Sequence, residues 1–209
     1  MQAEQVDLMT AQQVIRETAR MRENFRIHLK AHTDPSHARV DQAFSQMDIA
    51  SPAGLIAFLS VHAACFTAMA SAQNAQFRGR NHLAELVTSI EHDLDALDVP
   101  TPPPLTFKLA DCDPLALDYI LEGSRLGSQV LARRWASSVD PHVLGAAAYF
   151  SRKPNVGPWR NVCDRLAQIA VGSARAEKIK MDTCALFDMF FDAAQAHGDV
   201  AQPDLEPVA

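Results

Sequence analysis

The chain contains little glycine, few aromatic residues and no excess of positive charge. Its 209 residues include 8 glycines, aromatic residues make up 7%, and the formal net charge is −6 at pH 7. The negative charge removes the electrostatic attraction on which nucleic-acid binding depends, so we expect no nucleic-acid partner. Hydrophobic residues make up 48% and charged residues 21%, which is typical of a globular chain. We expect a single domain over residues 1–209, with flexible tails at about 1–9 and 198–209.

The cysteines lack the spacing of a disulfide framework or a zinc site. Cys65, Cys112, Cys163 and Cys184 lie far apart in the sequence, and no C-x-x-C pair occurs. We therefore expect reduced thiols in a cytoplasmic protein. The first ten residues include acidic residues and no apolar run, so a secretory signal is not expected.

One apolar stretch, residues 52–72, is about as long as a membrane span. It is rich in alanine, carries His62 near its middle, and has no basic cluster at either end. These features favour the buried core helix of a soluble protein, so we expect no membrane partner.

The sequence also lacks sustained alternation of β-branched residues, whereas alanine, leucine and glutamine recur throughout. This composition predicts an all-α fold. We expect a loop at Pro100 to Pro104, and a helix start or a kink at Asp34-Pro35. The predicted helices run from Thr10 to about His32, from Ser51-Pro52, from about Asn81 to Leu97, from Asp113-Pro114 to about Trp135, briefly from Asp140-Pro141, through Gly157-Pro158, and from Ala174 to Ala196.

Five residues near the N-terminus recur at helical spacing: Lys30, Thr33, His37, Asp41 and Phe44. On a helix they share one face. A histidine on an inward face can bind iron through one nitrogen and give its other N–H to a carboxylate one turn later. The same pattern is also typical of a core histidine beside an acid, and spacing alone favours that plainer interpretation.

Two of the few glycines, Gly123 and Gly127, fall one turn apart inside a predicted helix. Each costs about 1 kcal/mol relative to alanine there, so a compensating reason is expected. Either two helices pack closely at this point, or the backbone approaches a flat ligand. Spacing does not separate these two explanations.

Longer motifs supply a family resemblance. L-K-x-x-T-x-x-x-H-x-x-x-D, over residues 29–41, resembles the proximal-helix signature of haem oxygenases. L-E-G-S-R-L-G, over residues 121–127, is similar to the distal helix of their bacterial, phytochrome-linked branch. F-L-S-V-H-A-A-C-F from Phe58 and P-W-R before Asn161 also resemble that branch. The similarity spans about Arg26 to Asp192, and the motifs occur in the expected order.

The resemblance implies a role for each matching residue. His37 matches the axial iron ligand, and Asp41 matches the carboxylate that orients it. The implied haem-binding residues are Lys30, Thr33, His37, Asp41 and Arg160, of which Lys30 and Arg160 match residues that meet the haem propionates. The implied distal, catalytic residues are Gly123, Ser124, Gly127 and Ser128.

Two of these distal positions differ from other enzymes of the family. Ser124 stands where many animal enzymes have an aspartate. Ser128 stands where the family usually has a further glycine, and its side chain either crowds the distal side or donates a hydrogen bond there.

The resemblance further implies a helical bundle of about eight helices that cleaves haem with O2 to biliverdin, carbon monoxide and ferrous iron. Haem is then both substrate and cofactor. No flavin or nicotinamide fingerprint occurs in the sequence, so the electrons must come from an external reductase or ferredoxin. The phytochrome-linked branch implies a bacterial phytochrome as the acceptor of biliverdin.

Three other interpretations stay open. The first is a non-catalytic haem-binding protein of the same fold that stores, transfers or senses haem. The second is a helical interaction module without haem. The third is a thiaminase-like enzyme, which requires an activated cysteine; Cys163 and Cys184 lie in apolar helical contexts with no evident activating base.

Overall fold

The computed structural model describes residues 24–72, 76–105, 107, 109, 111–152 and 155–198. In these residues the chain forms seven α-helices and no strand, which confirms the all-α prediction. The predicted tail at 1–9, the predicted cap Thr10 and residues 199–209 lie outside the described part. The helices are α2 (Phe25–Ser45), α3 (Pro52–Ser71), α4 (Arg80–Ala96), α5 (Pro114–Trp135), α6 (Pro141–Gly145), α7 (Val156–Leu166) and α8 (Ala174–Gly198).

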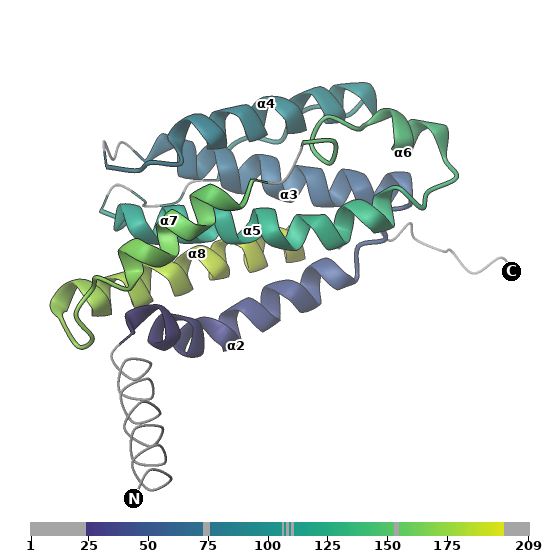
Figure 1. Ribbon diagram of the computed structural model, residues 1–209. Coiled ribbons are helices and arrows are strands. Elements are labelled where there is room, and N and C mark those ends of the chain that lie inside the picture. Colours follow the sequence, from purple (N-terminus) through teal and green to yellow (C-terminus); the bar gives the residue numbers. More distant parts are fainter. Residues whose placement is uncertain are drawn as a thin grey trace, which may run out of the picture.

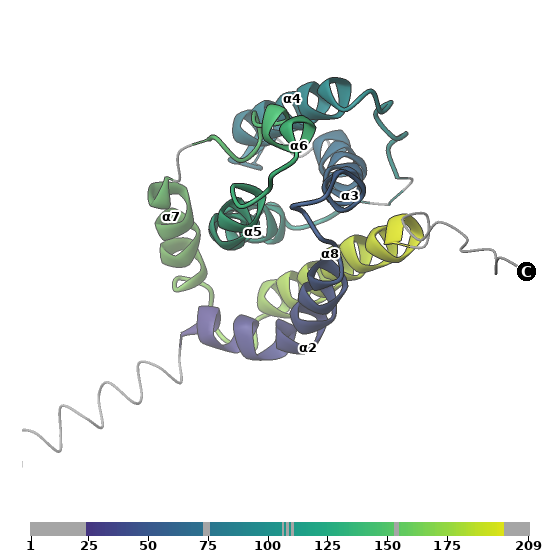
Figure 2. The same ribbon diagram turned by 90° about the vertical axis from the view of Figure 1, so that its right-hand side faces the viewer.

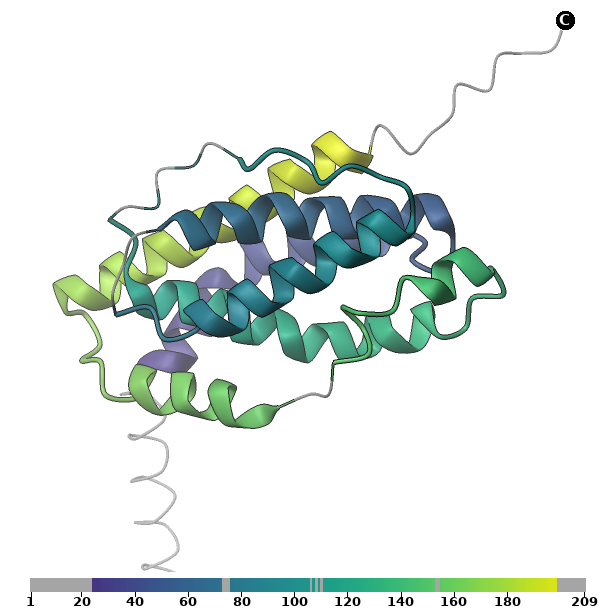
Figure 3. The ribbon, with the colours of Figure 1, turned by 90° about the horizontal axis from the view of Figure 1, so that it is seen from above.

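Helix α5 lies in the middle of the bundle (Figure 2), and the other helices surround it. It packs on α7 and α8, while α3 packs on α4 and α8, and α2 packs mainly on α8. Figure 1 shows α4 and α2 at opposite sides of the bundle, and Figure 3 shows α6 and α7 along one edge. Because α5 is central, each side of it faces different neighbours.

The predicted helix end near His32 is wrong, because α2 does not end there. The helix continues through Pro35 to Ser45. Pro35 is exposed, so the Ala31 carbonyl left without its helical donor can face water. Buried Leu29 and Val40 lie on either side of the proline. Because both are buried, a single helix with a bend is favoured rather than two separate helices (Figure 2).

The other helix starts agree with the sequence signals. Ser51, Asp113 and Asp140 are N-caps, each followed by proline in the first turn, and their side chains accept backbone N–H bonds. Helices α4 and α8 match their predicted bounds within two residues, and the segment Pro100 to Pro104 is not helical, as expected.

Helix α3 is the core helix of the bundle, as its composition predicts. By length and composition it could cross a membrane, but 78% of its most apolar window is buried against the other helices. Gly54 allows its first turn to approach the preceding loop, because a Cβ at this position would lie 2.1 Å from the Asp48 carbonyl oxygen. Of the four cysteines, all free, Cys65 and Cys112 are buried while Cys163 and Cys184 are partly exposed.

Candidate functional site

A cavity of about 440 Å³ lies between α2 and α5, with α3 and α8 and the segment after α6 completing its walls. Its apolar surface comes mainly from phenylalanines of α2, α3 and α8, namely Phe44, Phe58, Phe187 and Phe190. We call it the apolar cavity. Aromatic walls of this kind suit a flat, largely apolar ligand.

His37 lines the α2 wall of this cavity. Its Nδ1 lies 3.1 Å from an Asp41 oxygen, and its ring meets Phe187 edge-on with centroids 5.2 Å apart. The side chain is 54% exposed, so this is not a core histidine. With Nδ1 oriented by Asp41, Nε2 is the nitrogen left for a metal or a hydrogen bond.

Gly123 and Gly127 line the facing wall, on α5. A Cβ on Gly127 would meet nothing within 4 Å, and one on Gly123 would make an ordinary 3.6 Å contact with Trp159. Close packing of protein against these glycines therefore does not explain them. At Gly127 the missing side chain leaves open space on the cavity wall, whereas at Gly123 it leaves room beside Trp159.

Ser124 and Ser128 also line the α5 wall. The Ser124 hydroxyl donates to the Leu121 carbonyl at 2.8 Å, and the Ser128 hydroxyl donates to the Arg125 carbonyl at 2.9 Å. Each proton is thus engaged by the helix itself, and only oxygen lone pairs remain for the cavity. In this arrangement neither serine supplies a hydrogen-bond donor to a ligand.

His62 and Tyr149 form a polar end to the cavity. The Phe58 carbonyl oxygen lies 2.9 Å from His62 Nδ1 and accepts a hydrogen bond from it, so Nδ1 carries the proton and Nε2 carries a lone pair. Burial lowers the pKa of His62 to about 4. The hydrogen bond to Phe58 raises this pKa, and the positive charge of Arg125 lowers it further. Burial raises the pKa of Tyr149. Both side chains are neutral at pH 7.

Arg125 lies behind this polar end. Its guanidinium carbon is 5.0 Å from the centroid of the Tyr149 ring. Arg125 Nη1 and the Tyr149 hydroxyl are the two buried side-chain polar atoms without a hydrogen-bond partner among the described residues. Arg125 and Tyr149 together separate the apolar cavity from the space beyond α5.

Three of the predicted haem-binding residues lie outside the lining of this cavity: Lys30, Thr33 and Arg160. Lys30 is 68% exposed and pairs with Asp34, and that hydrogen bond raises its pKa. Thr33 is buried and donates to the Leu29 carbonyl at 2.9 Å. Arg160 is exposed on α7. The arginine that does line the cavity is Arg134, which sequence reasoning did not select.

Sequence reasoning also missed the side chains that close the cavity, chiefly Tyr149, Phe187 and Phe190. No local signal marks them. His62 does have a signal, because it is the polar residue in the middle of the most apolar helix, and a buried histidine there requires a partner. In the described residues no group of three or more His, Cys, Asp or Glu side chains forms a metal site. A metal at this site would therefore have to bring further ligands of its own.

No protein-family model matches this chain, and no match is found among curated proteins. The motifs quoted above and the geometry of the apolar cavity are therefore what bears on its function.

Proposed function

We propose that this chain binds haem in the apolar cavity and is a haem oxygenase that converts haem, O2 and electrons to biliverdin, carbon monoxide and ferrous iron. The observation that carries the proposal is the placement of His37 opposite Gly127, on separate helices across one cavity, with open space where a Gly127 side chain would lie. The two resembling motifs are far apart in the sequence, and both line this cavity.

The residues present fit a haem. His37 is held by Asp41 with Nε2 left to bind iron. The phenylalanines supply flat apolar walls, and Gly127 leaves open space on the α5 wall. Arg134 would pair with a propionate, because a guanidinium binds a carboxylate through two parallel hydrogen bonds. The predictions that Lys30 and Arg160 meet the propionates, and that Thr33 helps to bind haem, stay predictions.

The bound haem would supply the oxygen chemistry of ring cleavage. The chain would hold and orient it between α2 and α5 and keep the inner end of the cavity closed with His62 and Tyr149. Because the Ser124 and Ser128 hydroxyls donate their hydrogen bonds to backbone carbonyls, the α5 wall offers a ligand no side-chain donor from these two residues. Electrons would come from an external reductase or ferredoxin, and a bacterial phytochrome would accept the biliverdin, as the resemblance implies.

A hemin titration tests the ligand assignment. We expect a shifted Soret band in the wild type, loss of that spectrum in His37→Ala, and its restoration by added imidazole. His142→Ala, which removes an exposed histidine on α6, is the matched control and should titrate like the wild type. An identical spectrum in His37→Ala would overturn the assignment of His37 as an iron ligand.

Ring cleavage needs a separate experiment. With ascorbate and oxygen, an oxygenase loses the Soret band and gains biliverdin absorbance. A stable haem complex would instead support a protein that stores, transfers or senses haem. One observation favours that second function: Ser128 lies on the cavity wall where the family usually has glycine, and its side chain is buried there.

A further inference from the structure

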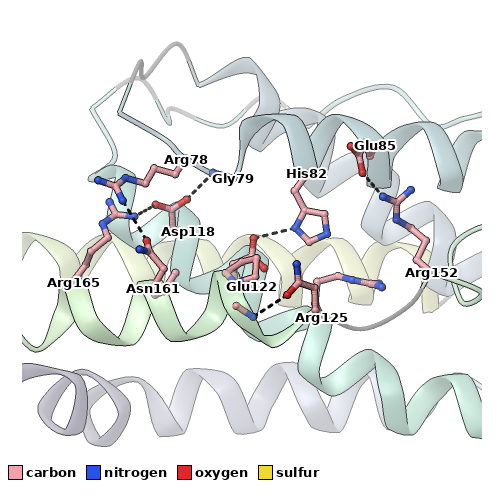
Figure 4. A pocket seen from close by; sticks show the side chains of 14 residues that line it. Arg78, Gly79, His82, Glu85, Asp118, Glu122, Arg125, Arg152, Asn161 and Arg165 are labelled. Carbon is pink, nitrogen blue, oxygen red and sulfur yellow. Dashed lines mark hydrogen bonds and ion pairs between the residues drawn. The ribbon is translucent and has the colours of Figure 1, made fainter.

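A second cavity lies on the other side of α5, between α4, α5 and α7. Its volume is about 520 Å³ and its lining is dominated by charged side chains. Figure 4 shows them along the length of the space. We call it the charged cleft. Its ionic residues are the arginines Arg78, Arg125, Arg152 and Arg165, the carboxylates Glu85, Asp118 and Glu122, and His82.

Each carboxylate of the charged cleft already has a partner. Asp118 binds Arg165 and accepts the Gly79 N–H at 2.9 Å. Glu85 pairs with Arg152. Glu122 lies 3.0 Å from His82 Nδ1 and its side chain is 5% exposed. These three carboxylates therefore leave no acid in the cleft for the remaining arginines.

Arg78 and Arg125 are those remaining arginines. In the part of the chain that the structure describes, neither makes an ion pair. Arg78 Nη1 reaches the Asn161 amide oxygen at 3.4 Å, which is a weak contact, and Arg125 lies over the Tyr149 ring. A guanidinium that faces a cavity without a carboxylate favours an anion from outside the chain.

The two arginines lie toward opposite ends of the cleft. In Figure 4 Arg78 is with Arg165 at one end, and Arg125 extends toward Arg152 at the other. Arg78 and Arg165 also line the adjoining hollow beside Arg175. Between the two ends lies Glu122, whose negative charge repels an anionic group placed in the middle. The cleft is thus positive at both ends and negative or neutral between them.

We propose that the charged cleft binds a small, elongated organic dicarboxylate, with one carboxylate at Arg78 and the other at Arg125. Two unpaired cations match the charge of a dicarboxylate, whereas two phosphates carry more negative charge than they would neutralise. His82 lies beside the middle of such a ligand and offers it a polar contact. This site is separate from the apolar cavity, so its test does not depend on haem.

Calorimetric titration of the full chain with linear dicarboxylates from succinate to suberate, with acetate for comparison, tests the proposal. We expect one chain length to bind about tenfold or more tighter than acetate. Arg78→Gln should weaken that binding about tenfold, and Arg125→Gln should do the same. Arg125→Lys should retain only part of it, because an ammonium group keeps the charge but not the two parallel hydrogen bonds. Arg133→Gln, an exposed arginine of α5 that lines neither cavity, should bind like the wild type.

Circular dichroism of each variant checks that the helices are intact. Arg78 is exposed and weakly bonded, so Arg78→Gln keeps the test decisive if Arg125→Gln disturbs the fold around Tyr149. Absence of dicarboxylate binding at about 10 mM would overturn the proposal. Equal binding of acetate, or equal weakening by Arg133→Gln, would also overturn it, because either result indicates a general charge effect.

Discussion

The two cavities beside α5 have similar volumes and opposite chemistry. The apolar cavity, at about 440 Å³, has phenylalanine walls and two glycines, whereas the charged cleft, at about 520 Å³, has arginines and carboxylates. One helix produces this difference. Asp118, Glu122 and Arg125 recur at spacings of four and three and face the cleft, while Gly123 and Gly127 face the apolar cavity.

The comparison shows that a central helix need not be apolar all round. A helix that is buried on all sides is usually hydrophobic all round, whereas the last turns of α5 expose Val130 and Arg133 to solvent. Helix α5 instead gives one side to ion pairs and the other to missing side chains. A cavity lies on each of these two sides, so we expect both sides of α5 to bind ligands.

The largest expected effect is a loss of folding stability when the segment that carries Tyr149, between the two cavities, loses its anchor. Buried Asp93 of α4 accepts the backbone N–H groups of Ala148 and Tyr149, each at 2.8 Å, and so fixes the segment that carries Tyr149. Asp93→Asn loses one acceptor and leaves a buried group unsatisfied. We expect a loss of about 4 kcal/mol in the free energy of unfolding, measured with urea. Asp95→Asn, exposed on the same helix, should change it little, and an equal loss there would contradict this role.

The next effect is a pH dependence that originates in the apolar cavity. Folding lowers the pKa of His62 from 6.5 to about 4. Between these values the unfolded chain takes up a proton that the folded chain refuses, so stability falls as the pH drops from 6.5 to 4. The full loss is about 3 kcal/mol. Denaturant unfolding at several pH values should show it in the wild type and in His142→Ala.

The same series in His62→Phe isolates the group responsible. Without a titrating ring at this position, most of the loss between pH 6.5 and 4 should disappear. If His62→Phe kept the wild-type slope, other groups would be responsible for the acid sensitivity.

A third effect separates the ligands of the two cavities. Gly127→Phe places a ring in the open space of the apolar cavity. It should weaken hemin binding about a hundredfold and leave dicarboxylate binding unchanged. Gln129→Phe, an exposed position on the same helix, controls for an added aromatic side chain. Equal hemin affinity in Gly127→Phe and the wild type would place haem elsewhere.

The smallest effect contrasts two glycines. Gly127→Ala adds a methyl group to open space inside a helix and should stabilise the protein by about 1 kcal/mol. Gly79→Ala puts its Cβ 2.5 Å from Leu121 Cδ2 and 2.9 Å from Phe77 Cε2, so it should destabilise by about 1 to 2 kcal/mol. Thermal unfolding measures both. Opposite signs support close packing at Gly79 and open space at Gly127.

The sequence predicted the features that local chemistry determines. Ser51-Pro52, Asp113-Pro114 and Asp140-Pro141 marked helix starts because a capping oxygen and a fixed proline φ act within one turn. The predicted helix end near His32 was wrong, because the helix continues through Pro35 as a bend, which was one of the two outcomes expected there, and buries residues on both sides of the proline. That burial comes from packing against α8, which lies far from Pro35 in the sequence, so the local sequence around the proline does not reveal it.

The site was predictable only in part, for a related reason. His37 and the glycine pair stood out as unusual residues within helical patterns. The side chains that complete the cavity, among them Tyr149 and Arg134, are ordinary in their local contexts and come together only through tertiary packing. The charged cleft had no sequence signal at all, since its ion pairs join α5 to α4 and α7, and α4 to the segment before α7.

Helix α2 supplies His37 but packs mainly on α8, while the glycine pair belongs to α5. A molecule held by His37 and pressed against Gly127 would therefore act as a cross-link between parts of the chain that are joined chiefly through α8. By linkage, such a molecule raises the free energy needed to detach α2 and slows hydrogen exchange of its amides. Helix α2, which would bind the ligand through His37, is then also the helix that the bound ligand holds more firmly to the bundle.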